Sequence, residues 1–136
     1  MPLEEDLVRL LASIDPELQP GTFVFCALGP EEPPTGLAVQ MLFRELEGTT
    51  VVVSLGDSES RALRGEFPCQ WIILGVRSDL AAVGFLAAVT ARLAVAGISA
   101  NVVSAAHHDH VFVPVGRGDD AMRVLRELQG RHQDGR

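Results

Sequence analysis

The sequence of 136 residues contains no lysine and no tyrosine, so all eleven basic side chains are arginines. Without lysine the chain cannot form a Schiff base, hold pyridoxal phosphate covalently or supply the lysine of a phosphate-binding P-loop. Acidic residues outnumber basic ones by 18 to 11, which leaves a net charge of −7. Because a nucleic-acid binder needs a basic surface that neutralises phosphates, we expect no nucleic-acid partner.

Cysteine is also scarce. The two cysteines, Cys26 and Cys69, lie far apart and match no zinc or redox spacing. Each lies beside an apolar run, and cysteine is among the residue types most often buried. We therefore predict two buried, reduced thiols with a structural role.

No segment of the sequence has the pattern of a signal peptide or a membrane span. Acidic residues follow Met1, where a signal peptide has basic ones. Between Leu80 and Ala106 the only charged residue is Arg92, but Gly97 interrupts this apolar stretch and polar residues follow. The sequence therefore predicts a cytoplasmic protein with no membrane partner.

Hydrophobic periodicity and turn residues divide the first half of the chain into short elements. The pattern predicts a helix over 3–14, a strand over 22–28, a loop over 30–36, a buried strand at 51–53, and a short helix or turn over 57–68 that leads to a linker at 66–68. The period is unclear over 37–46.

The second half has clearer elements. The pattern predicts a buried strand over 70–76, a helix over 79–96 capped by Ser78 or Asp79, strands over 100–105 and 109–115, and a final helix that begins at 118. This β-α-β-β-α order indicates an α+β fold, with helices on one face of a mostly antiparallel sheet. The predicted domains are residues 1–68, residues 69–131 and a flexible tail over 132–136. The helix over 79–96 is apolar almost all round, so we expect a second copy of the chain to cover part of it, forming a homodimer.

Three stretches of the second half carry a resemblance to a known family: Ser78 to Val89, Gly97 to Val103, and His108-Asp109-His110-Val111-Phe112-Val113-Pro114. With them the chain resembles small bacterial ACT-domain proteins built from two ACT-like halves, and residues 43–49 are similar to the matching motif of the first half. The resemblance covers most of residues 20–128. It implies two ferredoxin-like halves (βαββαβ) that bind an amino acid at a domain or subunit interface, as the distantly similar arginine sensors of animals do. This sequence departs from the family pattern at Ala100, usually cysteine, and at Ala106 and His107, usually aromatic.

The first part of the candidate binding site is the segment from Ser78 to Gly84. A helix that starts there presents unpaired N–H groups and the positive end of its dipole, which attract a carboxylate. Gly84 has no Cβ and would let a ligand approach closely. The same residues also fit an ordinary capped core helix, and the sequence leaves both interpretations open. The candidates in this segment are Ser78, Asp79, Leu80, Val83 and Gly84.

The second part of the candidate site is Asn101 with the string from His107 to His110. Alternate residues of a strand share a face, so we expect His108 and His110 on one face and Asp109 on the other. Two imidazoles on one face can bind a transition metal, but no further ligand stands at a recognisable spacing, and we predict no metal. The alternatives are contact of Asn101, His108, Asp109 and His110 with a ligand, and a purely structural role.

No catalytic motif stands out, because the chain has no nucleophile elbow, no phosphate loop and no paired acids near a helical histidine. We therefore expect a non-enzymatic regulatory module without a cofactor, which binds a small molecule, an amino acid, at an ACT–ACT interface. One alternative is a ligand-free dimerisation module. Another is a metal-dependent enzyme that uses His108 and His110.

Overall fold

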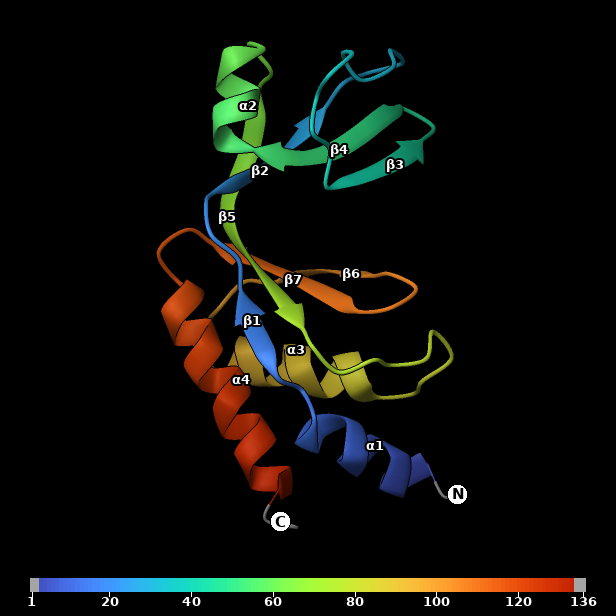
Figure 1. Cartoon of the computed structure of the whole chain (residues 1–136), viewed down its shortest axis with the longest axis vertical. Helices are drawn as coiled ribbons and strands as arrows, with labels where there is room; N and C mark the ends of the chain where they lie inside the picture. The colour runs from blue at the N-terminus through green and yellow to red at the C-terminus, as the bar shows by residue number, and fades with distance from the viewer. Residues whose placement is uncertain (1–2, 134–136) are drawn as a thin grey trace. The chain divides into compact units, whose positions relative to one another are not determined.

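The computed structural model describes residues 3–133, with side chains from residue 6 onward (Figure 1). The elements are α1 (Leu3–Ala12), β1 (Pro16–Leu18), β2 (Phe23–Ala27), β3 (Met41–Glu45), β4 (Gly48–Ser54), α2 (Leu55–Ser60), β5 (Gly65–Leu74), α3 (Phe85–Val95), β6 (Asn101–Ser104), β7 (Asp109–Pro114) and α4 (Gly118–Gln133). The chain forms two compact units. Residues 20–69 form the inserted unit, and the segments before and after it, 1–19 and 70–136, form the terminal unit.

The terminal unit has the strand order β1-β5-β7-β6. β1 pairs antiparallel with the end of β5, where Pro16 lies opposite Leu74, and β6 pairs antiparallel with β7. Starting from β5, the chain runs β-α-β-β-α through α4. A βαββαβ fold needs one more strand after these five elements. β1, from the start of the chain, takes the place of that last strand. This unit is therefore a βαββαβ fold whose last strand is supplied in permuted order, and the predicted α+β class is confirmed.

One side of this sheet carries the main hydrophobic core. Ile72 and Leu74 of β5 face the same way as Val111 and Val113 of β7, because alternate strand residues share a face. Helices α3 and α4 cover that face with a set of buried apolar side chains: Phe85, Val89, Leu93, Ala121, Met122, Val124, Leu125 and Leu128.

The first helix also belongs to the terminal unit. Leu11 and Ile14 lie in its core, and α1 packs against α3 and α4. The predicted division at residue 68 groups this helix with the first half instead. It packs elsewhere because β1, which follows it directly, pairs with the end of β5 some 55 residues further along the chain.

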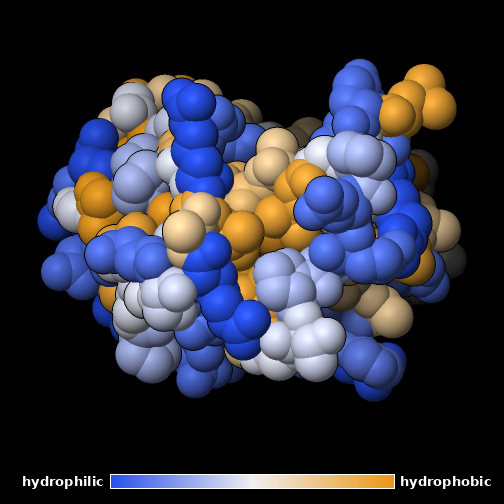
Figure 2. Space-filling model, turned by 90° about the horizontal axis from the view of Figure 1, so that it is seen from above, coloured by the Kyte–Doolittle hydropathy of each residue, from blue (hydrophilic) through white to orange (hydrophobic). Residues whose placement is uncertain are grey.

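The inserted unit has the order β3-β4-β2-β5 with α2 as its one helix among the described residues. Irregular chain over 28–40 stands where a βαββαβ fold has its first helix. Val24, Cys26, Val51 and Val53 form its core, and partly buried apolar residues of the irregular segment, of α2 and of the turn after it pack against them. Seen from above, hydrophobic residues gather in the centre of this unit between hydrophilic ones (Figure 2).

Several of the sequence predictions agree with the observed fold. The strands predicted over 22–28, 51–53, 100–105 and 109–115 are β2, β4, β6 and β7. Both cysteines are buried and free, as predicted. Among the described residues, no helix has the length and apolar character needed to cross a bilayer.

Three further predictions differ from the structure. The linker expected at 66–68 lies inside β5, where Phe67 has a φ of 53° and the pairing with β2 shifts register in a bulge. The linker was predicted because proline has no N–H to donate within a sheet. A bulge in a strand accommodates such a residue, so β5 continues through Pro68. The tail expected from 132 is helical through Gln133, and His132 Nδ1 lies 2.9 Å from the Leu128 carbonyl oxygen. Residues 134–136 lie outside the described residues. The third difference, at the start of α3, concerns the candidate site.

Candidate functional site

The segment from Ser78 to Gly84 is a loop, and α3 begins only at Phe85. The prediction that Ser78 or Asp79 caps a helix is therefore wrong. Asp79 Oδ1 instead accepts a hydrogen bond from the Ala81 N–H at 2.9 Å, and the Asp79 carbonyl accepts from Ala82 at 2.9 Å. Aspartate often closes such a turn and so competes with helix formation. Gly84 then has a φ of 91°, a left-handed conformation that separates the turn from the helix.

A short hydrogen bond ties this loop to the sheet. The Ser78 hydroxyl donates to Asp109 Oδ2 at 2.6 Å. Asp109 is the first residue of β7 and lies opposite Ser104 of β6, and it is only 3% exposed. The buried carboxylate is therefore bound to a loop side chain, and the two separate halves of the predicted site meet here.

Replacing Ser78 by alanine removes the hydroxyl that donates to this buried carboxylate, and we expect the free energy of unfolding to fall by about 1–2 kcal/mol. A buried acceptor without its donor bears a desolvation penalty, which the small neighbouring cavity can relieve by admitting water. Chemical denaturation of the variant measures the change. Ser60→Ala is the control, because the Ser60 hydroxyl bonds only to an exposed helix carbonyl. Equal stability of the two variants would contradict the expectation.

Three cavities of the terminal unit meet at this loop. The largest, about 540 Å³, lies between α1 and the loop and is lined by Asp6, Leu7, Arg9, Leu10, Ser13, Val76, Arg77, Asp79, Ala81, Ala82 and Val83. A second, about 390 Å³, is lined by Arg77, Ser78, Asp79, Leu80 and Ala106. The third, about 130 Å³, reaches the start of α3 and is lined by Ser78, Asp79, Leu80, Ala82, Gly84, Phe85, Leu86, Ala87, Ser104 and Asp109. Asp79 lines all three.

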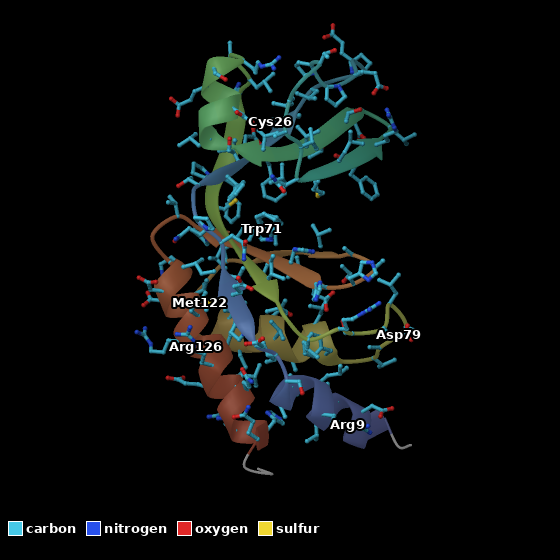
Figure 3. The ribbon with its side chains drawn as sticks, viewed as in Figure 1. Arg9, Cys26, Trp71, Asp79, Met122 and Arg126 are labelled. Carbon is cyan, nitrogen blue, oxygen red and sulfur yellow. The ribbon has the colours of Figure 1, made fainter. Side chains whose placement is uncertain are left out.

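The charges around the largest cavity fall into two groups. On α1, Arg9 and Asp6 form an ion pair with an N–O distance of 3.0 Å. On the loop, Arg77 has no hydrogen bond or ion pair to any residue that the structure describes. Figure 3 shows Arg9 on α1 and Asp79 on the loop, the two elements that line this cavity. Arg77 and Asp79 therefore offer one cation and one anion, two residues apart in the chain, in its lining.

The other predicted site residues lie elsewhere. Asn101 lies opposite Phe112 in the β6–β7 pair, so it shares a face with His110, and Asp109 is on the opposite face. His108 stands before β7, where its carbonyl accepts from the Ala105 N–H at 3.0 Å in the β6–β7 turn. The structure thus gathers Ser78, Asp79, Leu80, Val83, Gly84 and Asp109 around the loop and separates Asn101 and His110 from them.

Within residues 3–133, no group of three or more histidine, cysteine, aspartate or glutamate side chains is arranged to hold a metal ion. His110 has a different partner: its Nδ1 accepts a hydrogen bond from Trp71 Nε1 at 3.0 Å, and the two rings lie 5.7 Å apart. Burial lowers the pKa of His110, and the charge of His108 lowers it further, against a smaller opposing effect of Asp109.

Acidification is expected to destabilise the protein through His110. Its pKa is lower in the folded chain, so below about pH 6.5 the unfolded chain binds this proton more readily, and stability falls as the pH falls through the folded pKa. Protonation of Nδ1 also ends its role as acceptor for Trp71, a bond worth about 0.5–1.5 kcal/mol.

Unfolding followed between pH 8 and pH 5 tests this, with fluorescence of Trp71, the one tryptophan, as a local reporter. In the His110→Gln variant the amide oxygen can still accept but does not titrate, so its fluorescence is expected to change less with pH. An unchanged pH profile in this variant would assign the effect to other groups.

Sequence reasoning missed the residues that α1 contributes to the largest cavity. Leu7 and Leu10 fit a helical apolar stripe, and nothing in that stripe indicates that the helix lies over a loop some 70 residues further on. Arg77 was also missed, although its position next to Ser78 and Asp79 was a usable signal, since a lone cation beside a candidate binding segment suits an anionic group.

Two family models describe the chain. An ACT domain model matches residues 2–70, and another ACT domain model matches residues 66–127, so the two meet within β5. None of the curated proteins matches the sequence at a significant level.

Similar solved structures agree in fold. A protein of unknown function from Vibrio cholerae, described as a possible transport protein, is 34% identical with a TM-score of 0.82, and the match covers 94% of this chain and 99% of that one. The ligand-free regulatory subunit of aspartate kinase from Thermus thermophilus is 15% identical with a TM-score of 0.61, covering 86% and 98% of the two chains. A protein from Agrobacterium tumefaciens is 20% identical with a TM-score of 0.67, covering 84% and 87%. With an ACT domain model over each half and a βαββαβ arrangement in the terminal unit, the chain belongs to the ACT domain family and carries two ACT domains in tandem.

Proposed function

We propose that this protein is a non-catalytic regulatory module that binds a free amino acid at the loop between β5 and α3. ACT domains are typically regulatory, and they generally bind small molecules such as amino acids. The neighbouring structure from Thermus thermophilus is itself named as a regulatory subunit. A cytoplasmic location, where free amino acids are abundant, is part of the same proposal.

One observation carries the choice of ligand: Arg77 and Asp79 both line a cavity of about 540 Å³. Small-molecule sites have volumes of roughly 300–1,000 Å³, are mostly apolar and hold a few placed polar groups. A free amino acid presents one carboxylate and one ammonium group on the same carbon. A guanidinium and a carboxylate that come from neighbouring loop positions match that pair of charges.

Thermal unfolding in the presence of each of the twenty amino acids tests the proposal. A ligand that binds only the folded protein stabilises it, by about 2.7 kcal/mol at a concentration of 100 times Kd. We expect a rise in melting temperature with at least one amino acid at millimolar concentration. The N-acetyl and amide forms of that amino acid are matched controls, because each lacks one of the two charges. No rise with any of the twenty would contradict the proposal.

The second candidate function is a dimerisation module without a small ligand. It is favoured by the outer side of α3, where Ala87, Ala91, Ala94 and Val95 are all exposed. We propose that a second copy of the chain covers this side, in a homodimer that is compatible with amino-acid binding. Light scattering on the purified protein measures the mass, and Ala91→Glu is expected to shift it toward that of the monomer. A monomeric wild-type protein would exclude the homodimer.

A further inference from the structure

The α1 helix supplies one wall of an open cavity beside the loop, and much of the lining of this cavity is apolar. On α1, Leu7 and Leu10 line the cavity, and Val76 and Val83 line it from the loop side. Both leucines are partly buried and pack against the core of the terminal unit. The lining of the cavity therefore has an apolar part, which we call the recess, beside its charged groups.

The charges of this cavity balance. Among the described residues that line the cavity, Asp6 and Arg9 give one anion and one cation on α1, and Asp79 and Arg77 give one of each on the loop. Asp79 is also oriented, because its Oδ1 is held by the Ala81 N–H while Oδ2 has no hydrogen bond among the described residues. When the carboxylate and ammonium groups of an amino acid bind Arg77 and Asp79, the other two described charges of the lining are paired with each other. A charged ligand side chain therefore has no unpaired partner among these residues.

From these features we infer that the ligand is an amino acid with a bulky apolar side chain, held between α1 and the loop. This inference rests on the proposed function. The ligand carboxylate binds Arg77, its ammonium group binds Asp79 Oδ2, and its side chain enters the recess beside Leu7, Leu10 and Val76. The α1 helix is therefore a specificity element of the site, and it comes from outside the βαββαβ core.

The attachment of α1 supports this role. Its last turn is fixed to α4, because the side chains of Gln129 and Gln133 both donate to the Ala12 carbonyl, at 3.3 and 3.2 Å. Toward its start, the helix rests on the beginning of α3: a Cβ placed on Gly84 would lie 3.5 Å from Leu7 Cδ2. A ligand that fills the space between Leu7 and the loop adds contacts at the end of α1 that lacks the glutamine anchors.

Isothermal titration with the full chain tests the inference, with leucine, phenylalanine, aspartate and arginine as probes. We expect leucine or phenylalanine to bind at least about 10-fold more tightly than either charged amino acid. Val83→Phe places a ring in the recess and is expected to weaken binding of that amino acid at least 10-fold. Val83 is 64% exposed, so the variant is expected to fold. Val115→Phe is its control, because Val115 is 51% exposed and lines none of the three cavities.

A second pair of variants tests the charged groups of the lining. Arg77→Ala removes the cation. We expect it to weaken the binding of every amino acid that the wild-type protein binds, whatever the side chain of that amino acid. Arg126→Ala is the control, because Arg126 is exposed on α4 and lines none of these cavities (Figure 3). Melting temperatures of all four variants verify that they are folded.

The outcomes separate the two proposals. Apolar preference together with weakened binding in Val83→Phe and Arg77→Ala supports the inference. Tighter binding of aspartate or arginine, or unchanged affinity in Val83→Phe, overturns the inference and leaves the proposed function in place. Failure of all twenty amino acids to bind the wild-type protein overturns both.

Discussion

Replacing Phe85 by alanine is expected to lower the free energy of unfolding by about 3–5 kcal/mol. Phe85 is the first residue of α3 and only 2% exposed, and it lies in the core of the terminal unit with Leu74 and Val111. Truncation removes the transfer energy of a whole aromatic ring and leaves a cavity that the surrounding strands cannot close.

The position of Phe85 increases the expected effect. It follows Gly84, whose left-handed backbone turns the chain from the loop into the helix, so the ring anchors that turn in the core. Urea denaturation compares the variant with Val115→Ala at an exposed position just after β7, for which a change within about 0.5 kcal/mol is expected. A cost for Phe85→Ala below about 2 kcal/mol would show that the start of α3 is not held by this side chain. Because Phe85 also lines the small cavity beside Asp109, looser packing there is expected to accompany weaker ligand binding.

Raising the pH from 9 to 11 is expected to cost about 2–3 kcal/mol of stability through Cys69. Burial raises the pKa of this thiol to about 11, from about 9 in the unfolded chain. Below pH 9 both states hold the proton. Between 9 and 11 the unfolded chain loses it first, so stability falls as the pH rises through this range. Burial raises the pKa of Cys26 as well, which adds to the effect in the same direction.

The composition of the chain makes stability changes between pH 9 and pH 11 easy to interpret. With no lysine and no tyrosine in the chain, the side chains that commonly titrate near pH 10 are missing, and arginine stays charged. Denaturation at pH 8, 9.5 and 10.5 is therefore expected to show a decline that is smaller in Cys69→Ala. An equal decline in this variant would contradict the assignment to Cys69. In the folded wild type at pH 8, both thiols are expected to resist alkylation, because both are buried and protonated.

The sequence pattern was most informative in two cases: where a strand is buried on both its faces, and where a helix ends at a clear turn residue. The run from Val51 to Val53 predicted β4, and Gly97 marked the end of α3 correctly, with a φ of 73°. These features are local, because the apolar period and the left-handed glycine act within a few residues of chain.

The start of α3 shows where such reasoning fails. Residues 78–84 contain good helix formers, and Ser78 and Asp79 are common N-caps, so local propensity predicts a helix. Both side chains are used differently: Ser78 reaches Asp109 in another strand, and Asp79 closes a turn. These hydrogen bonds outweigh the local helix propensity. In the resulting loop, Asp79 lines three cavities.

The division of the chain depended on tertiary structure in the same way. A boundary near residue 68 follows the two family models, yet α1 and β1 pack with residues 70–136. The pairing of β1 with the end of β5 and the packing of α1 on α3 and α4 bring the first helix to the loop before α3. No periodicity within either segment records that pairing.

By itself the sequence determined the class of fold, the buried thiols, the ACT family and the segment that carries the candidate site. Composition, period and short motifs were sufficient for these, because each depends on neighbouring residues. The tertiary structure decided that Ser78 binds Asp109, that His110 and Asn101 lie on the opposite face of the sheet, and that α1 and the loop line one cavity. Those relations join residues that are far apart in the chain, and they exist only once the strands have paired and the helices have covered one face of the sheet.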